Sequence, residues 1–441
     1  MSNLFFLRIF VSMRPVLTLL LLIVPWADSA AEEWARFRGP NGSGISTATG
    51  IPVTWTETDY QWQIDLPVQG SSSPVVLGSR IFLTGDDAEN GQRSILAIDA
   101  ESGRIQWRCD YPFEDHYLHR DNDFASGTPC VDEDGVIVVW STPEQLLMIA
   151  LSLDGQEQWR RDLGPYKGLH GSSSSPIIAD GLVVLANDQM DPKRFSFYLP
   201  DDTNMDPGKS FLIALDRKTG ETRWKVDRKS ELAGYATPCI RRVGDRAEAI
   251  FTSTVHGITA VDLQTGAISW EIDQLWDNRT VSSPQLHGEL VFGSFGQGLS
   301  GQRLVAVRPG GAGSAEGELV YDITKNVPLV PSFVVKDDLL FLWTDSGVVT
   351  CVEAETGEVH WRERVGGDFY SSPLWIEGRL YGISKRGEVV VLAASRDFAE
   401  LGRVDLGEKT FATPAVADGV MYLRTQTRLS ALGKAKIPGD R

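Results

Sequence analysis

Few residues of this sequence have the types and spacing that chemistry requires. HYLHRDNDFASG (116–127) holds two histidines with carboxylates nearby, a set that zinc and other transition metals use. DDTNMDPG (201–208) sets oxygens at alternate positions as a calcium loop does, but Ile213 stands where such a loop has a bidentate Glu. GQGLSG (296–301) matches a dinucleotide fingerprint, although strand-forming residues follow where a helix is needed. A polar loop, an insertion and a chance match explain these segments, so we expect no metal site and no catalytic residues.

An internal repeat supplies the elements that must position any binding residue. In each copy a turn ends one apolar run, and an aromatic residue follows the turn's glycine four places later. Asp and Gly favour a tight turn between strands, because Asp hydrogen-bonds the backbone ahead of it and Gly accepts a positive φ. The pairs are Gly103/Trp107, Gly155/Trp159, Gly220/Trp224, Gly266/Trp270, Gly317/Tyr321 and Gly357/Trp361.

Small hydroxyl residues followed by a proline mark the start of each repeat. Eight such prolines recur at intervals of 41 to 62 residues: Pro74, Pro129, Pro176, Pro238, Pro284, Pro331, Pro373 and Pro414. Proline suits the first residue of a strand, and each unit has room for four short antiparallel strands. In the sixth unit we expect them at 331–335, 338–343, 347–352 and 358–364. The pattern predicts an all-β, eight-bladed β-propeller of four-stranded blades, with seven blades as the alternative.

The last unit predicts how the ring closes. It stops after three strands, and the missing fourth strand, YQWQIDL (60–66), stands at the other end of the chain. We therefore expect 61–66 to pair with 427–431. The regular aromatics would then be apolar plates that fill the wedges between blades. These blade-packing residues are Trp62, Trp107, Trp159, Trp224, Trp270, Tyr321 and Trp361.

The N-terminus has the pattern of a targeting segment. Arg8 and Arg14 precede the apolar run VLTLLLLIV (16–24), which is short for a membrane span, and small residues follow at 27–31. We expect an exported, soluble, monomeric protein of the periplasm or cell envelope, with no transmembrane span in the mature chain. The expected parts are a signal peptide (1–31), an N-terminal extension (32–59), the propeller (60–433) and a C-terminal tail (434–441).

Charge and cysteine content narrow the function further. The 441 residues include 42 Lys and Arg against 59 Asp and Glu, for a net charge of −17. So acidic a chain lacks the basic stripe that nucleic-acid binding needs. The four cysteines fall at places in the repeat that should lie beyond bridging distance, so we expect unpaired thiols.

The A-x-D-x-x-T-G-x-x-x-W signature resembles that of the pyrroloquinoline quinone (PQQ)-like propeller repeats. These repeats occur in quinoprotein alcohol dehydrogenases and in BamB-type outer-membrane assembly factors. WARFRGPNGSGIS (34–46), HGSSSSPI (170–177) and AVRPGGAG (306–313) are similar to an exported, planctomycete-type branch of this group.

The resemblance implies three candidate functions. The first is a non-catalytic scaffold that binds a protein or ligand, as BamB-type proteins do, with no cofactor. The second is a quinoprotein alcohol or sugar dehydrogenase that uses PQQ with calcium. Such enzymes usually carry adjacent cysteines over the quinone, and this sequence has none. The third is a carbohydrate-binding propeller.

The loops between blades are the expected ligand or partner face, because propellers bind at the mouth of the channel. These loops carry aromatic and polar residues suited to a peptide, a glycan or a small polar ligand. The alternative is that they only plug the channel. The candidates are Arg120, Asp121, Asp123, Phe124, His170, Tyr235, Asn278, Arg279, Phe369, Tyr370 and Phe411.

Overall fold

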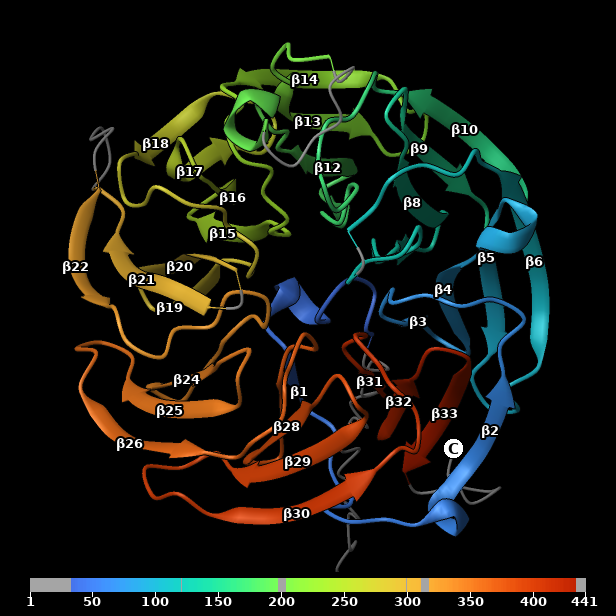
Figure 1. Ribbon diagram of the computed structural model, residues 1–441, viewed down its shortest axis with the longest axis vertical. Helices are drawn as coiled ribbons and strands as arrows, with labels where there is room; N and C mark the ends of the chain where they lie inside the picture. The colour runs from blue at the N-terminus through green and yellow to red at the C-terminus, as the bar shows by residue number, and fades with distance from the viewer. Residues whose placement is uncertain (1–32, 120, 197–203, 299, 311–316, 434–441) are drawn as a thin grey trace, which may run out of the picture. The chain divides into compact units, whose positions relative to one another are not determined.

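The fold is a ring of eight β-sheets around a central channel (Figure 1). A computed structural model describes residues 33–119, 121–196, 204–298, 300–310 and 317–433. Each sheet contains a blade of four antiparallel strands, consecutive in sequence in seven of the eight blades, and one sheet has a fifth, parallel strand. The prediction of an eight-bladed propeller is confirmed. No helix in the described ranges is long and apolar enough to cross a membrane.

The blades are numbered in chain order. Blade one contains β3 (Val75–Leu77), β4 (Arg80–Asp87), β5 (Gln92–Asp99) and β6 (Ile105–Pro112). Blade two contains β7 (Cys130–Asp132), β8 (Gly135–Ser141), β9 (Leu146–Leu151) and β10 (Glu157–Asp162). Blade three contains β11 (Ile177–Ala179), β12 (Leu182–Asn187), β13 (Ser210–Asp216) and β14 (Thr222–Arg228). Blade four contains β15 (Cys239–Val243), β16 (Arg246–Ser253), β17 (Gly257–Asp262) and β18 (Ile268–Ile272).

The second half of the ring repeats this plan. Blade five contains β19 (Gln285–His287), β20 (Leu290–Gln297), β21 (Ser300–Arg308) and β22 (Glu318–Ile323). Blade six contains β23 (Val334–Lys336), β24 (Leu339–Trp343), β25 (Val348–Glu353) and β26 (Val359–Arg364). Blade seven contains β27 (Leu374–Ile376), β28 (Arg379–Ile383), β29 (Glu388–Ala393) and β30 (Glu400–Asp405), joined by β1 (Ile45–Ser46). Blade eight contains β31 (Ala415–Ala417), β32 (Val420–Arg424), β33 (Arg428–Gly433) and β2 (Tyr60–Asp65).

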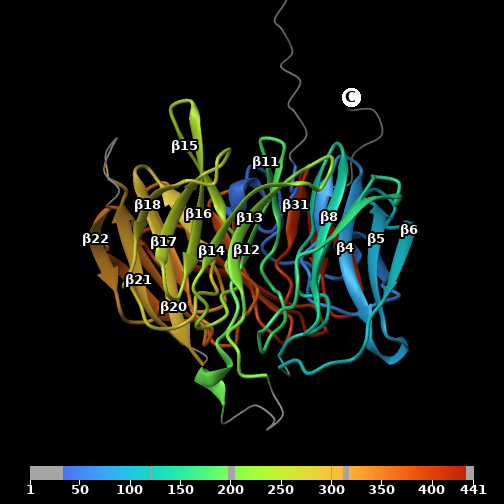
Figure 2. The same ribbon diagram turned by 90° about the horizontal axis from the view of Figure 1, so that it is seen from above.

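Four 3₁₀ turns complete the described elements. They are η1 (Pro40–Gly42), η2 (Glu57–Asp59), η3 (Ala88–Asn90) and η4 (Pro192–Phe195). Viewed from the side, the strands run between the two faces of the ring, and η4 projects from one of them (Figure 2).

Burial explains why the sequence reads as it does. The second strand of a blade lies between two neighbouring blades, so both of its faces are covered. β24 is therefore buried along its whole length, and its sequence is a continuous apolar run. The outermost strand has one covered side, and in β26 Trp361 is the single buried residue, His360 is half-buried and the other four residues are exposed.

The ring closes by joining the two ends of the propeller. β2 pairs antiparallel with β33, with Tyr60 opposite Leu432 and Asp65 opposite Arg428. This is the predicted closure, with the strands at 60–65 and 428–433 in place of the predicted 61–66 and 427–431. It leaves blade eight with strands from opposite ends of the chain, so no blade is left with three strands.

The repeated turn glycine and the repeated aromatic of the preceding blade meet at five blade boundaries. A Cβ on Gly220, the turn glycine of blade three, would lie 2.7 Å from the indole of Trp159 in blade two. Six aromatics also hydrogen-bond a carbonyl of the following blade, at 2.6–3.0 Å. Trp270 differs, since its Nε1 donates to Glu248 within its own blade. The six donors are Trp62, Trp107, Trp159, Trp224, Tyr321 and Trp361.

A closed ring of hydroxyl residues ties the inner ends of the blades together. In each blade a backbone N–H donates to the side-chain oxygen of the equivalent residue in the next blade, at 2.9–3.3 Å. The eighth bond, from Thr413 to Ser73, completes the circle. The members of this hydroxyl ring are Ser73, Thr128, Ser175, Thr237, Ser283, Ser332, Ser372 and Thr413.

The hydroxyl ring corrects one landmark of the sequence. Seven members directly precede a landmark proline, but Ser332 follows Pro331 and precedes Phe333. Pro331 is therefore out of register with the other prolines. The first strand of blade six accordingly begins at Val334, three residues after the predicted start.

Residues 34–46, hereafter the channel plug, lie inside the channel along the inner strands (Figure 1). Trp34 exchanges two backbone hydrogen bonds with Val76 of β3, and Asn41 bonds both backbone groups of Ile240 in β15. Further along, β1 pairs parallel with β27. The plug thus fills the channel beyond the level of the hydroxyl ring. The channel plug belongs to the expected N-terminal extension (32–59), and it packs inside the propeller.

Candidate binding site in the central channel

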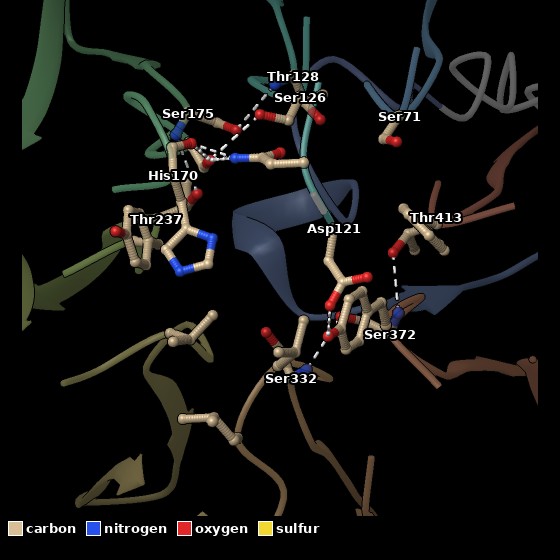
Figure 3. A pocket seen from close by; sticks show the side chains of 18 of the residues that line it. Ser71, Asp121, Ser126, Thr128, His170, Ser175, Thr237, Ser332, Ser372 and Thr413 are labelled. Carbon is tan, nitrogen blue, oxygen red and sulfur yellow. Dashed lines mark hydrogen bonds between the residues drawn. The ribbon is translucent and has the colours of Figure 1, made fainter. Parts of the chain in front are cut away.

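A cavity of about 530 Å³, hereafter the channel pocket, lies at the face of the ring where the inner strands begin (Figure 3). Seven of the eight ring hydroxyls line it, and Ser283 does not. Phe37 of the channel plug also lines it, and η1 lies behind the labelled residues in Figure 3. The remaining walls come from the loops between blades and from the hairpin between β28 and β29. The cavity size is in the range typical of small-molecule sites.

One wall combines a cation, a carboxylate and two aromatic rings. The Nζ atom of Lys385, in the β28–β29 hairpin, lies 4.0 Å from the ring centroid of Tyr370 and 5.4 Å from that of Phe411. It is also 3.8 Å from a carboxylate oxygen of Asp121. The Tyr370 hydroxyl donates to the other oxygen of Asp121 at 3.4 Å. Burial, with the nearby Asp121, raises the pKa of Tyr370 to about 12, so the phenol keeps its proton.

The opposite wall holds an arginine against a neutral histidine. Nη1 of Arg279 lies 3.1 Å from Nε2 of His170, and because a guanidinium only donates, Nε2 is the acceptor. Burial, helped by Arg279 and His119, lowers the pKa of His170 to about 3. The imidazole of His119 packs 4.5 Å from that of His170, and Tyr235 packs 5.6 Å away on another side. His170 therefore acts as an uncharged support for Arg279.

A buried carboxylate shapes a third wall. Asp345 is 4% exposed and accepts the backbone N–H groups of Leu329 and Val330 at 2.7 and 3.1 Å. Both of these residues line the pocket. Burial raises the pKa of Asp345 to about 6, while the two N–H bonds oppose the shift. Asp345 thus positions an apolar stretch of the wall without reaching the cavity.

The structure brings six of the eleven predicted face residues together in the pocket. They are Asp121, His170, Tyr235, Arg279, Tyr370 and Phe411. Asp123 and Phe124 line a separate cavity of about 10 Å³, where Phe124 packs against His116. Asn278 donates to Gln297 and does not line the pocket. Arg120 lies outside the described residues.

The placement of Phe369 on the ligand face was wrong. Its side chain is fully buried and packs 5.2 Å from Trp343 in the core between blades six and seven. Neighbouring residues of an extended segment point to opposite sides, so Tyr370 faces the pocket while Phe369 faces the core between blades six and seven. Of the five aromatic residues among the predicted candidates, three line the pocket: Tyr235, Tyr370 and Phe411.

Several lining residues were missed. Lys385 lies in a hairpin within blade seven, and a lysine in a polar turn carries no signal of a binding role. His119 and Asn122 stand in the 116–127 loop among the predicted residues. Phe37 comes from the N-terminal extension, which was not expected in the channel. Seven of the eight ring hydroxyls directly precede a landmark proline, and that recurrence was the available sequence signal.

The three chemistry-like segments have structural explanations. His116 bonds the carbonyl of Glu114, and no three described His, Cys, Asp or Glu residues cluster as a metal site would. Residues 201–203 lie outside the described ranges, and Lys167 donates to the carbonyls of Asn204 and Asp206 in the rest of that loop. The 296–301 segment joins β20 to β21, which is a strand–strand connection.

Comparison with known proteins agrees with this architecture. A family model described as "Outer membrane protein assembly factor BamB" matches residues 94–314 and 300–435. The outer membrane protein assembly factor BamB of Yersinia pestis is 18% identical over 358 residues, covering 79% of this chain and 70% of that protein. The BamB of Alkalilimnicola ehrlichii is 28% identical over 165 residues, covering 37% of this chain and 34% of that protein.

Two solved structures share the fold. BamB from Moraxella catarrhalis superposes with a TM-score of 0.58 at 15% identity, covering 85% of this chain and 97% of that one. The quinohemoprotein alcohol dehydrogenase from Comamonas testosteroni superposes with a TM-score of 0.64 at 12% identity, covering 92% and 82%. At these identities the likeness establishes the propeller and leaves the function to the residues of the pocket.

Proposed function

Because this chain belongs to the outer membrane protein assembly factor BamB family, we propose that it is a non-catalytic propeller that binds a protein partner or a small polar ligand at its channel pocket. The observation that carries the proposal is the composition of that pocket. Its ring hydroxyls each accept a backbone N–H, and among the described contacts neither the His119 nor the His170 imidazole accepts a proton from a serine or threonine hydroxyl. Ser71 donates to the Asp123 carboxylate at 2.5 Å, but no described imidazole is positioned as a general base for a pocket hydroxyl.

The quinoprotein alternative requires calcium, which takes 6–8 oxygen ligands and several carboxylates. Among the described lining residues, Asp121 is the one carboxylate, and it already faces Lys385 and Tyr370. A lysine beside the sole carboxylate disfavours a divalent cation there. The residues of the pocket do not fit a calcium-bound quinone, and this supports binding rather than dehydrogenation.

We also place the protein in the cell envelope. The support is the signal-like segment 1–31, which lies outside the described residues, together with the family's description as an outer-membrane assembly factor. N-terminal sequencing of the protein from an envelope fraction tests this, with a new N-terminus near residue 30 expected. Recovery of the intact N-terminus from the cytoplasm would contradict it.

The catalytic alternative is tested by calorimetry. The protein is titrated with PQQ in the presence and absence of calcium chloride, and we expect no calcium-dependent saturable binding. Calcium-dependent binding at one site, followed by oxidation of an alcohol with a dye as acceptor, would overturn the proposal.

The binding role is tested by photo-crosslinking in the native cell. A photoreactive residue replaces Asn278, near the pocket mouth, and the matched control replaces Lys218, on the turn between β13 and β14 at the opposite face. We expect a discrete adduct from position 278 and none from position 218. Adducts from both positions, or from neither, would contradict a partner at this face.

A further inference from the structure

We propose that the channel pocket binds a small organic oxyanion, with its carboxylate or phosphate held by the hydroxyl ring and Arg279. This inference rests on the proposed role of the pocket as a binding site and names the class of its ligand.

The hydroxyl ring presents donors to the cavity. Each ring oxygen accepts a backbone N–H from the preceding blade. Among the contacts between described residues, none of the eight hydroxyls donates its own proton to a protein acceptor. A serine or threonine hydroxyl has one proton to donate, so those lining the pocket can direct it at a ligand. A circle of donors favours a ligand atom that only accepts, such as a carboxylate or phosphate oxygen.

The charges on the walls favour the same class. Two cations, Arg279 and Lys385, line the pocket against Asp121, while the whole chain carries a net charge of −17. Lys385 is close to Asp121, but Arg279 forms no ion pair with any described carboxylate. His170 lies neutral behind Arg279, because burial holds its pKa at about 3. Arg279 is thus a cation of the pocket that has no described carboxylate as its ion-pair partner.

The rest of the surface indicates an apolar body on the ligand. Phe37, Val281, Leu329, Val330 and Phe411 line the cavity between the polar groups. A cavity of about 530 Å³ exceeds the needs of a bare inorganic ion. A free carboxylic acid and the carboxylate at the end of a polypeptide share this chemistry.

The test is calorimetric titration of the full chain at pH 7 with benzoate, and with the tripeptide N-acetyl-Ala-Ala-Phe for a chain end. Benzamide and the amidated tripeptide are the neutral controls. We expect each acid to bind about tenfold or more tightly than its amide, the factor that loss of a charged hydrogen-bond partner produces. Tighter binding of benzoate would indicate a free carboxylic acid as the ligand, and tighter binding of the tripeptide would indicate the end of a polypeptide. Equal binding of acid and amide, or no binding of either acid, would overturn the proposal.

Variants locate the anion. Arg279→Gln should weaken benzoate binding about tenfold or more, and Asp121→Asn should strengthen it by removing a like charge. The control is Arg386→Gln, because Arg386 is exposed beside Lys385 and does not line the pocket. If Arg386→Gln weakens binding as much as Arg279→Gln does, the attraction is general and the proposal is wrong.

A matched pair tests the ring itself. Ser332→Ala and Ser283→Ala each remove one acceptor for a neighbouring N–H, but only Ser332 lines the pocket. We expect similar losses in unfolding midpoint and weaker benzoate binding only for Ser332→Ala. Failure of every acid to bind, with PQQ also unbound, would remove this inference and leave the proposed scaffold role standing.

Discussion

The indole ring of Trp159 lies against the α-carbon of Gly220 in the next blade, so that a Cβ there would be 2.7 Å from the ring. Gly220 also has a φ of +69°. Gly220→Ala should therefore destabilise the propeller by about 2–4 kcal/mol, from the left-handed backbone and the overpacked contact together. Urea unfolding followed by tryptophan fluorescence measures this.

Gly181→Ala is the control for that substitution. Gly181 has a φ of +76°, but nothing lies within 4 Å of the Cβ it would gain. Gly181→Ala should lower the free energy of unfolding by about 1–2 kcal/mol, which is the penalty of the left-handed backbone alone. Equal losses for the two variants would show that the tryptophan contact contributes nothing.

The hydroxyl ring predicts a stability effect at Thr128. Its Oγ1 accepts the N–H of Ser73 at 3.0 Å in a buried position. Thr128→Val keeps the shape of the side chain but leaves this buried N–H without an acceptor. It should lower the free energy of unfolding by about 1–3 kcal/mol. Thr128→Ser retains the oxygen, so it should lose less. A serine variant as unstable as the valine variant would mean that packing, not the hydrogen bond, matters here.

A buried ion pair links blades two and three. The Arg217 guanidinium is 2% exposed and bonds the Asp132 carboxylate through Nε and Nη2 at 2.7–3.1 Å. Asp132→Ala leaves the buried cation without a partner and should cost about 3–5 kcal/mol. Asp134→Ala removes the exposed pair with Lys218, 3.8 Å apart, and should cost less than about 1 kcal/mol. Chemical unfolding of both variants tests the difference, and similar losses would contradict it.

Asp188 predicts how stability depends on pH. Burial raises the pKa of its carboxyl from 3.8 to about 7, while Arg228 opposes the shift. The folded state therefore favours the protonated form, and this stabilisation is present below about pH 4 and lost as pH rises through 7. Asp188→Asn stays neutral throughout. Its stability relative to the unmodified protein should rise between pH 4 and 8 by up to about 4 kcal/mol.

The measurement for Asp188 is the free energy of unfolding at several pH values. The matched control replaces Asp245, an exposed residue in the turn between β15 and β16, by Asn. A constant difference between the protein and Asp188→Asn over this range would contradict the buried, protonated carboxyl.

The repeat predicted the fold because its signals are local. The glycine turn, the aromatic four residues later and the three-strand final unit each appear within a few residues of sequence. The site was predicted less completely because it depends on direction and register. Phe369 and Tyr370 are adjacent but point to opposite sides, and Ser332 rather than Pro331 marks blade six. Lys385 reaches the pocket only because the ring brings its hairpin beside Asp121.

The pairing of β2 with β33 has a consequence for the order of folding. The strand at Tyr60–Asp65 is synthesised before blades one to seven, and its partner at Arg428–Gly433 is synthesised after them. The channel plug likewise contacts blades four and seven, so it cannot bind in the channel until these blades have formed. Until β33 has been synthesised, both ends of the array expose strand edges that favour aggregation. Removal of β2 or of β33 should therefore yield an open, aggregation-prone array rather than a smaller ring.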